Sequence, residues 1–233
     1  YMKEERIEIV GFNTFMEIPM IRRRMMANTD RILYPTKRHA EIKEVYGIPC
    51  FTKRQDEMIY RYRQQKARGK ITSSVEKCVI NSQTYDSFYK LSNFAHKLLF
   101  FGKLHKVSHL CCQYLKKEPA IKYEKESGKK PILGIMGVES ITRKSKITSC
   151  FNAKKYFYPI WDLSEALKED IEKQFGIEVP KIYEYTTQTG CAGCPYGLRA
   201  KRSAHELDYC TPNQRKFIID YFKESYNVHG FQY

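Results

Sequence analysis

The hydrophobic positions of this chain form short apolar runs, separated by longer stretches in which apolar residues recur at helical spacing. The runs at 6–12 and 131–136 predict buried strands, and 48–52 predicts the end of another. Helices are expected over the stretches with helical spacing, which are 17–27, 37–46, 55–66, 84–101, 164–175 and 211–226. Strands that alternate with helices indicate a layered α/β fold.

Residues that favour helix ends sharpen some of these boundaries. Ser164 is a typical N-cap, and Gly176 is expected to end the helix that Ser164 begins. Pro212 suits the first turn of the last helix. Apolar residues at helical spacing should face the core, and in these two helices they are Leu167, Ile171, Phe175, Phe217, Tyr221 and Phe222. A polar turn is expected at 124–130.

The sequence shows no boundary between independent domains. The chain has no internal repeat, heptad pattern or low-complexity linker. We therefore expect one domain, with an α/β part over 1–180 and a cysteine-bearing, helical extension of the same domain over 181–233.

Composition and charge narrow the class of protein. Hydrophobic residues make up 42% of the chain and aromatic residues 14%, which argues against disorder. No apolar run reaches the roughly 18 residues that span a membrane, and the first residues do not resemble a secretory signal, so a cytoplasmic protein is expected. The 41 Lys and Arg residues against 26 Asp and Glu give a net charge of +15. That excess favours an anionic partner such as a nucleic acid or a nucleotide.

Four of the eight cysteines fall into two tight pairs, Cys111-Cys112 and Cys191-x-x-Cys194. Four thiolates suit either a tetrahedral zinc ion or a four-iron cluster. Adjacent cysteines are awkward ligands for one zinc ion because neighbouring side chains point apart, so we favour a 4Fe-4S cluster over zinc. The alternative is that Cys111 and Cys112 are core residues and that Cys191 and Cys194 form a redox pair.

The segments around these cysteines resemble the phosphoadenosine phosphosulfate (PAPS) reductase family. The run CCQYLKKEP at 111–119 resembles the CC-x-x-R-K-x-x-P segment of its iron–sulfur members, with Leu115 in place of Arg. The run GIMGVESITR at 134–143 resembles G-x-R-x-x-[EQ]-S-x-x-R, and TGCAGCP at 189–195 resembles the closing R-x-G-C-x-x-C-P. The motifs stand in the family's order.

Weaker matches extend this resemblance over most of residues 7–195. The run NTFMEIP at 13–19 resembles the D-T-G-x-E-x-P turn, and PIW at 159–161 resembles P-[LI]-x-x-W in a shorter form. The run GIPCFTK at 47–53 is similar to the strand and Lys of phage-encoded and DNA-phosphorothioation relatives.

The resemblance implies an adenine nucleotide alpha-hydrolase-like fold, with a twisted, mainly parallel sheet and helices on both faces. A nucleotide would lie across the carboxyl ends of the strands. The relatives bind adenylyl sulfate, PAPS or ATP, and they reduce activated sulfate or install sulfur in nucleic acid. By resemblance, a 4Fe-4S cluster and ATP or PAPS are the expected ligands here.

Five residues of the matching motifs are candidates for binding the substrate anion, namely Lys53, Lys116, Glu139, Ser140 and Arg143. A hydroxyl and a guanidinium just past a strand end can hold phosphate or sulfate oxygens, and the two lysines add positive charge. The carboxylate of Glu139 would be repelled by an anion, so we expect it to orient Arg143 or a ribose hydroxyl. The alternative is a helix start in which Glu139 and Ser140 are capping groups.

Three departures from the family pattern bear on the reaction. The chain has no S-G-G-x-D-S phosphate loop and no Gly-Gly pair, so either it is a fragment, a partner chain supplies the loop, or the loop has been lost. Asn13, Phe15 and Met136 stand where the family has Asp, Gly and Arg. The chain also lacks the E-C-G-x-H segment whose cysteine attacks sulfur, which leaves the catalytic residues unassigned.

Three functional hypotheses remain. The first is an iron–sulfur enzyme that acts on an adenylylated or sulfur-containing nucleotide by sulfur transfer or sulfate reduction. The second is a catalytically degenerate, basic module that binds nucleic acid or protein and is stabilised by the metal centre. The third is a structural domain held together by zinc.

Overall fold

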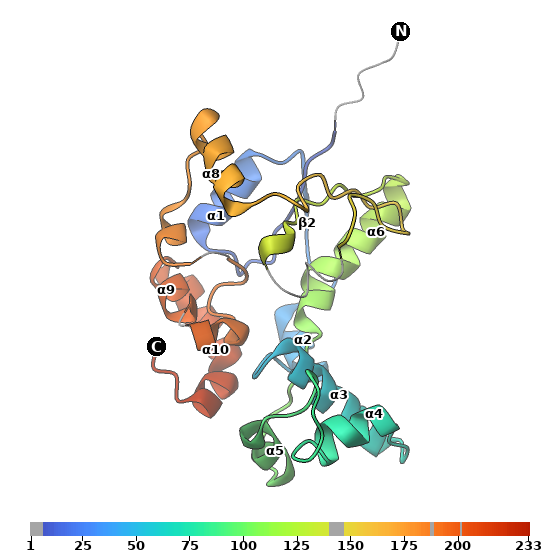
Figure 1. The fold of residues 1–233 in the computed structure, drawn as a ribbon. Helices are drawn as coiled ribbons and strands as arrows, with labels where there is room; N and C mark the ends of the chain where they lie inside the picture. Colours follow the sequence, from blue (N-terminus) through green and yellow to red (C-terminus); the bar gives the residue numbers. More distant parts are fainter. Residues whose placement is uncertain (1–6, 140–146, 187–188, 201) are drawn as a thin grey trace. The chain divides into compact units, whose positions relative to one another are not determined.

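The computed structural model describes residues 7–139, 147–186, 189–200 and 202–233 (Figure 1). It divides into two compact units. The first comprises the described residues of Tyr1–Pro119 and Lys181–Tyr233, and the second is Ala120–Pro180. The C-terminal segment with Cys191 and Cys194 therefore belongs to the same unit as Cys111 and Cys112.

The first unit begins with a parallel β–α–β arrangement. Strand β1 (Val10–Phe12) pairs with β2 (Arg31–Leu33), and helix α1 (Pro19–Ala27) connects them. A Cβ on Gly11 would lie 2.8 Å from Cγ of Met25, so glycine at this position lets α1 approach the strand closely. The predicted strand at 6–12 is confirmed over its last three residues, and the predicted helix at 17–27 is confirmed.

The middle of the first unit is helical. Helix α2 (His39–Val45) ends at Gly47, whose φ is +93°, and Ile48 then forms a parallel bridge with Val107. The remaining elements of this part are α3 (Lys53–Ala67), α4 (Ser73–Val75), a π-helical turn (Glu76–Ile80) and α5 (Asn93–Phe100). The expected helix at 84–101 is wrong over its first half. Ser92 caps α5 by accepting the amide of Ala95 at 3.2 Å, so the helix begins there.

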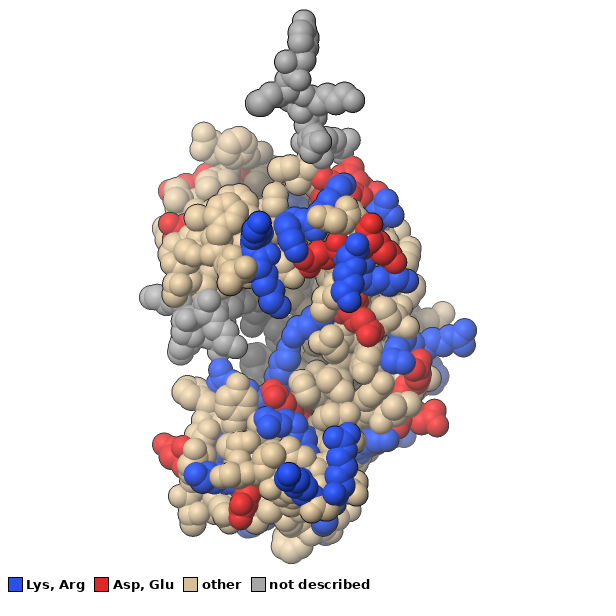
Figure 2. Space-filling model, turned by 90° about the vertical axis from the view of Figure 1, so that its right-hand side faces the viewer, with Lys and Arg blue, Asp and Glu red and all other residues tan. Residues whose placement is uncertain are grey.

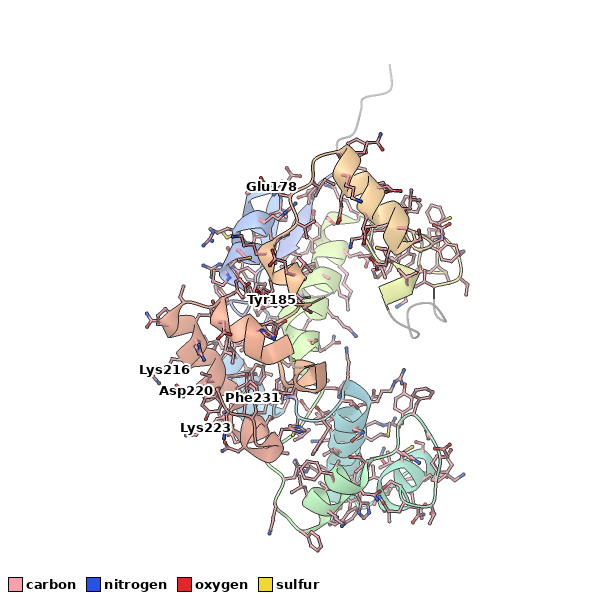
Figure 3. All side chains as sticks on the ribbon, turned by 60° about the vertical axis from the view of Figure 1, so that its left-hand side comes forward. Glu178, Tyr185, Lys216, Asp220, Lys223 and Phe231 are labelled. Atoms are coloured by element: carbon pink, nitrogen blue, oxygen red, sulfur yellow. The ribbon has the colours of Figure 1, made fainter. Side chains whose placement is uncertain are left out.

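The C-terminal part of the first unit contains Cys191 and Cys194. It contains 3₁₀ turns at Lys181–Glu184 and Pro195–Ala200, followed by α9 (Arg202–Asp208) and α10 (Pro212–His229). Helix α10 begins after Thr211, whose hydroxyl accepts the amide of Gln214. Its inward residues include Tyr221, Phe222 and Tyr226, whereas Lys216, Asp220 and Lys223 point away from the unit (Figure 3).

The second unit contains little regular β-structure. Helix α6 (Glu118–Ser127) crosses the boundary at Pro119 and ends before Gly128, so the expected polar turn at 124–130 is wrong over its first four residues. Ile132 and Phe157 form only an isolated parallel bridge, and Ile132 is 46% exposed. The expected buried strand at 131–136 is therefore wrong, because it has no continuous partner strand among the described residues.

The rest of the second unit is a 3₁₀ turn at Gly137–Glu139 and helix α8 (Glu165–Gln174). Ser164 caps α8 by accepting the amide of Leu167 at 3.2 Å, as predicted. The expected inward stripe is not buried, since Leu167 is 51% and Phe175 70% exposed.

The fold class is thus mixed α/β, with helix predominant. Within the described residues, the only sheet is the two-stranded parallel pair β1–β2. None of the helices described here combines the length and the apolar character that crossing a membrane requires.

Candidate metal centre

The loop that carries Cys191 and Cys194 is fixed through its backbone. The amide of Ala192 donates to the carbonyl of Met16 at 2.7 Å, which ties the loop to the turn after β1. The amide of Cys194 donates to the carbonyl of Cys191 at 3.2 Å and closes the loop on itself. Ala192 is fully buried, while both cysteines are half-buried. The two sulfur atoms are therefore presented by a tight turn.

Gly193 forms the centre of this turn. Its φ is +65°, and its amide donates to Oε2 of Glu206 at 3.1 Å. Its carbonyl accepts a short hydrogen bond from the hydroxyl of Tyr226. A Cβ at this position would lie 2.6 Å from that hydroxyl and 2.8 Å from Cγ2 of Ile218. Only glycine fits here, because both the backbone conformation and the available space exclude a side chain.

Cys111 and Cys112 lie in a helical turn that leads into a π-helical segment, Gln113–Lys117. Cys111 is 4% exposed and belongs to a small apolar cluster with Ile42 and Leu115, against which Cys191 also packs. Cys112 is half-buried. Short π-helical turns are frequent at functional sites because they widen the helix locally.

The two cysteine pairs influence each other electrostatically. Burial raises the pKa of the Cys111 thiol well above its ordinary value, and the nearby sulfurs of Cys191, Cys112 and Cys194 raise it further. Burial also raises the pKa of Cys191 to about 11, although the charge of Lys116 opposes the increase. The four predicted ligand cysteines thus lie in the first unit, where Cys191 packs against the apolar cluster of Cys111, although their segments are about 80 positions apart.

The turn after β1 adds polar groups beside this cluster. Thr14 is fully buried and donates from its amide and its hydroxyl to the carboxylate of Glu17, at 2.9 and 2.7 Å. The Thr14 hydroxyl also lies 3.7 Å from Sγ of Cys191. Phe15 has a φ of +64° and stacks on Tyr34. The resembled motif has Gly at this position, and the backbone here is indeed in the left-handed region. In this chain, however, the position carries the large ring of Phe15.

Lys116 connects the cysteines with this turn. Its Nζ lies 3.7 Å from Oε1 of Glu17, and its side chain is 38% exposed. Burial lowers the pKa of Lys116, but the combined negative charge of Cys191, Glu17 and Cys112 outweighs burial and leaves the pKa raised. Lys116 therefore stays charged beside the thiols and can offset negative charge on them.

Helices α2 and α10 complete the surroundings. Burial lowers the pKa of His39, whose ring interacts with the backbone of Thr14 and meets Tyr221 edge-on at 5.6 Å. Tyr221 is 5% exposed, and burial together with the adjoining Cys111 sulfur raises its pKa. His39 and Tyr221 were not predicted as site residues, and no motif marks them.

The other predicted anion-binding residues do not join this cluster in the described structure. Lys53 is exposed at the start of α3, where its charge adds to burial in lowering the pKa of His109. Glu139 ends the 3₁₀ turn of the second unit, and its side chain is not described. Ser140 and Arg143 lie outside the described residues.

All eight cysteines fall within the described residues and are free thiols. Cys50 and Cys78 are buried, Cys150 is exposed, and the thiol of Cys210 donates to the carbonyl of Glu206 at 3.4 Å. Among the described side chains, no three His, Cys, Asp or Glu residues form a compact group around a single ion position.

The chain was compared with protein-family models, with curated proteins and with solved structures. None of the three comparisons found a match.

Basic and acidic side chains are mixed on one face of the molecule. On the face shown in Figure 2, Lys and Arg side chains are distributed over the surface with Asp and Glu residues between them. Each unit contains ion pairs, such as Lys43 with Glu224 at 2.8 Å in the first unit and Lys130 with Glu124 at 2.5 Å in the second. This face presents no single basic patch.

Proposed function

We propose that this chain is an iron–sulfur protein whose 4Fe-4S cluster is held by Cys111, Cys112, Cys191 and Cys194. The observation that supports the proposal is that Cys191, a free thiol, packs against the apolar cluster of Cys111 from a distant segment, and that the sulfurs of Cys112 and Cys194 also act on the Cys111 thiol. A buried cysteine that serves only as an apolar core residue needs no other thiols nearby, whereas a metal centre needs several. When bound, such a cluster would supply one-electron chemistry or a structural anchor.

The donor set favours a cluster over zinc. Adjacent residues in a helical turn point in different directions, which suits separate iron corners better than one tetrahedral ion. The charge of Lys116 and the hydroxyl of Thr14, 3.7 Å from Cys191, also suit the negative charge and the acceptor sulfurs of a cluster.

Substitution of one ligand tests the metal centre. We expect Cys191→Ser to lose iron and to lower the unfolding temperature, because loss of a structural metal ligand is usually loss of folding free energy. Cys150→Ser is the matched control, since Cys150 is exposed and lies in the other unit. Iron and sulfide analysis after anaerobic reconstitution gives the measurement. Equal iron content in both variants would contradict the assignment.

We further propose that the protein acts on an adenylylated or sulfur-containing nucleotide, by sulfur transfer or sulfate reduction. The ordered motifs and the net charge of +15 support this substrate class. Calorimetric titration with ATP and with PAPS should give saturable heat with the cluster-loaded protein. A loaded protein that binds neither nucleotide would contradict the proposed substrate class and leave the cluster assignment standing.

Two observations favour the alternative of a degenerate, metal-stabilised binding module. Phe15 occupies a left-handed position where the resembled motif has Gly, and its ring is 47% exposed. Met136 stands where the motif has Arg, and it is 6% exposed. The first change adds bulk and the second removes a charge. Loaded protein that binds a single-stranded oligonucleotide but no adenine nucleotide would support this alternative.

A further inference from the structure

Helix α10 places one buried hydroxyl against the thiols without giving it a conventional partner. Tyr221 is 5% exposed, and its hydroxyl makes no hydrogen bond to a nitrogen or oxygen atom among the described residues. The hydroxyl adjoins the sulfur of Cys111. Leaving a buried donor unpaired costs free energy, so such groups in folded proteins call for an explanation.

The ring of Tyr221 cannot turn away to find water. His39 meets it edge-on at 5.6 Å, and Phe222 does so at 4.8 Å. Nζ of Lys43 lies 5.8 Å from the ring centre and also donates to the Tyr221 carbonyl at 2.9 Å. Aromatic and cationic contacts on several sides therefore fix the direction of the hydroxyl.

We propose that Tyr221 is a positioning residue whose hydroxyl donates a hydrogen bond to the Cys111 sulfur when that sulfur is bound to the cluster. A neutral thiol is a weak acceptor, whereas a metal-bound thiolate carries negative charge and accepts more strongly. The hydroxyl that lacks a conventional partner would then be satisfied. This inference rests on the proposed iron–sulfur function. It adds a residue that tunes the reduction potential of the cluster.

Hydrogen bonds to the sulfurs of an iron–sulfur cluster raise its reduction potential, because they stabilise the more negative, reduced state. Tyr221→Phe removes the donor and keeps the ring. We expect about a tenfold fall in the equilibrium constant for reduction, which corresponds to a potential lower by ~59 mV for a one-electron couple.

The same helix provides a matched control. Tyr226 is also fully buried near the cysteine loop, but its hydroxyl already donates to the carbonyl of Gly193. Tyr226→Phe should lower the unfolding temperature of the metal-free and the loaded protein alike. Tyr221→Phe should leave the metal-free protein as stable as the wild type or more so, since it removes an unpaired buried group.

The experiment compares the wild type, Tyr221→Phe and Tyr226→Phe after anaerobic reconstitution, by iron analysis and by potentiometric titration of the visible absorption. Loaded proteins in which only Tyr221→Phe has the lower potential would support the inference. Equal potentials in the wild type and Tyr221→Phe would overturn it while leaving the cluster in place. A wild-type protein that takes up no iron would overturn both the inference and the proposed function.

A second measurement applies if Tyr221→Phe does not hold the cluster. The iron–sulfur stretching bands of the loaded wild type are then compared by resonance Raman spectroscopy in H₂O and after unfolding and reconstitution in D₂O. The comparison is repeated on Thr14→Val, because the Thr14 hydroxyl lies 3.7 Å from Sγ of Cys191 and would also respond to deuteration. A shift of the cysteine-sulfur bands that persists in Thr14→Val would support a donor at Cys111, and identical bands in H₂O and D₂O would overturn the inference.

Discussion

Gly193 shows how strictly one residue can be specified by the geometry of this centre. It lies between the two cysteines of the loop, with φ at +65° and with three other side chains closing around its Cα. A side chain at this position would collide with Tyr226, Ile218 and Leu207, which pack around the loop. The requirement is backbone conformation and space together, so no substitution satisfies both.

We therefore predict that Gly193→Ala destabilises the fold by about 2–4 kcal/mol, from left-handed strain and overpacking combined. Gly190→Ala is the control, because a Cβ there meets nothing within 4 Å. Urea unfolding of the metal-free proteins measures both. The prediction fails if Gly193→Ala and Gly190→Ala lower the free energy of unfolding by the same amount.

At the scale of elements, the residues at helix ends were the most informative part of the sequence. Ser164, Pro212 and Gly176 mark ends that the structure reproduces within about two residues, because capping is a local interaction. The strand expected at 131–136 failed because a strand depends on a partner elsewhere in the chain, and here the pairing is one bridge. Apolar composition alone does not specify that partner.

The same distinction holds for the site. The four cysteines that we propose as ligands stand out in the sequence because of their spacing, and Thr14 and Glu17 lie in a matching motif. Tyr221 and His39 could not be predicted, since the proximity of Tyr221 to Cys111 and the contact of His39 with Tyr221 depend on how α10 and α2 pack. A tyrosine at an inward position of an amphipathic helix has no local feature that marks it as a neighbour of a metal centre.

A buried carboxylate in helix α3 makes the stability of the fold depend on pH. The carboxylate of Asp56 is fully buried and accepts the amides of Cys50 and Phe51 at 2.7 and 3.0 Å, which joins the preceding segment to the helix. Burial raises the pKa of Asp56 to about 7. Because the folded pKa lies above the unfolded one, the folded protein binds more protons between the two values, and stability is lost as pH rises through that window.

For Asp56→Asn, we predict that the unfolding free energy relative to the wild type rises on the order of 4 kcal/mol between pH 4 and pH 8. The side-chain amide of Asn cannot ionise, so the variant does not lose this stability as the pH rises. Asp86→Asn is the control, because the Asp86 side chain is 99% exposed. Denaturant unfolding at several pH values measures the difference. An Asp56→Asn profile parallel to that of the wild type would contradict the argument.

At the scale of the whole molecule, charge is the feature that bears on the proposed anionic partner. The net charge is +15, and on the face shown in Figure 2 Lys and Arg side chains lie among Asp and Glu side chains. Such a distribution attracts polyanions through long-range electrostatics without specifying their sequence.

Binding of a single-stranded oligonucleotide should therefore weaken by at least about tenfold between 50 and 200 mM NaCl, because several phosphates exchange their counterions for protein cations. Fluorescence anisotropy with two unrelated sequences measures this, and both should respond alike. Binding that is insensitive to salt would argue against an electrostatic partner surface.

The central claim is that four thiols bind one iron–sulfur cluster, and chemical analysis of the wild-type protein tests it most directly. Anaerobically reconstituted protein should contain about four irons and four inorganic sulfides per chain, with the broad visible absorption and Mössbauer spectrum of a 4Fe-4S cluster. A colourless protein with one zinc ion, or a disulfide between the cysteine pairs in place of metal, would contradict the account.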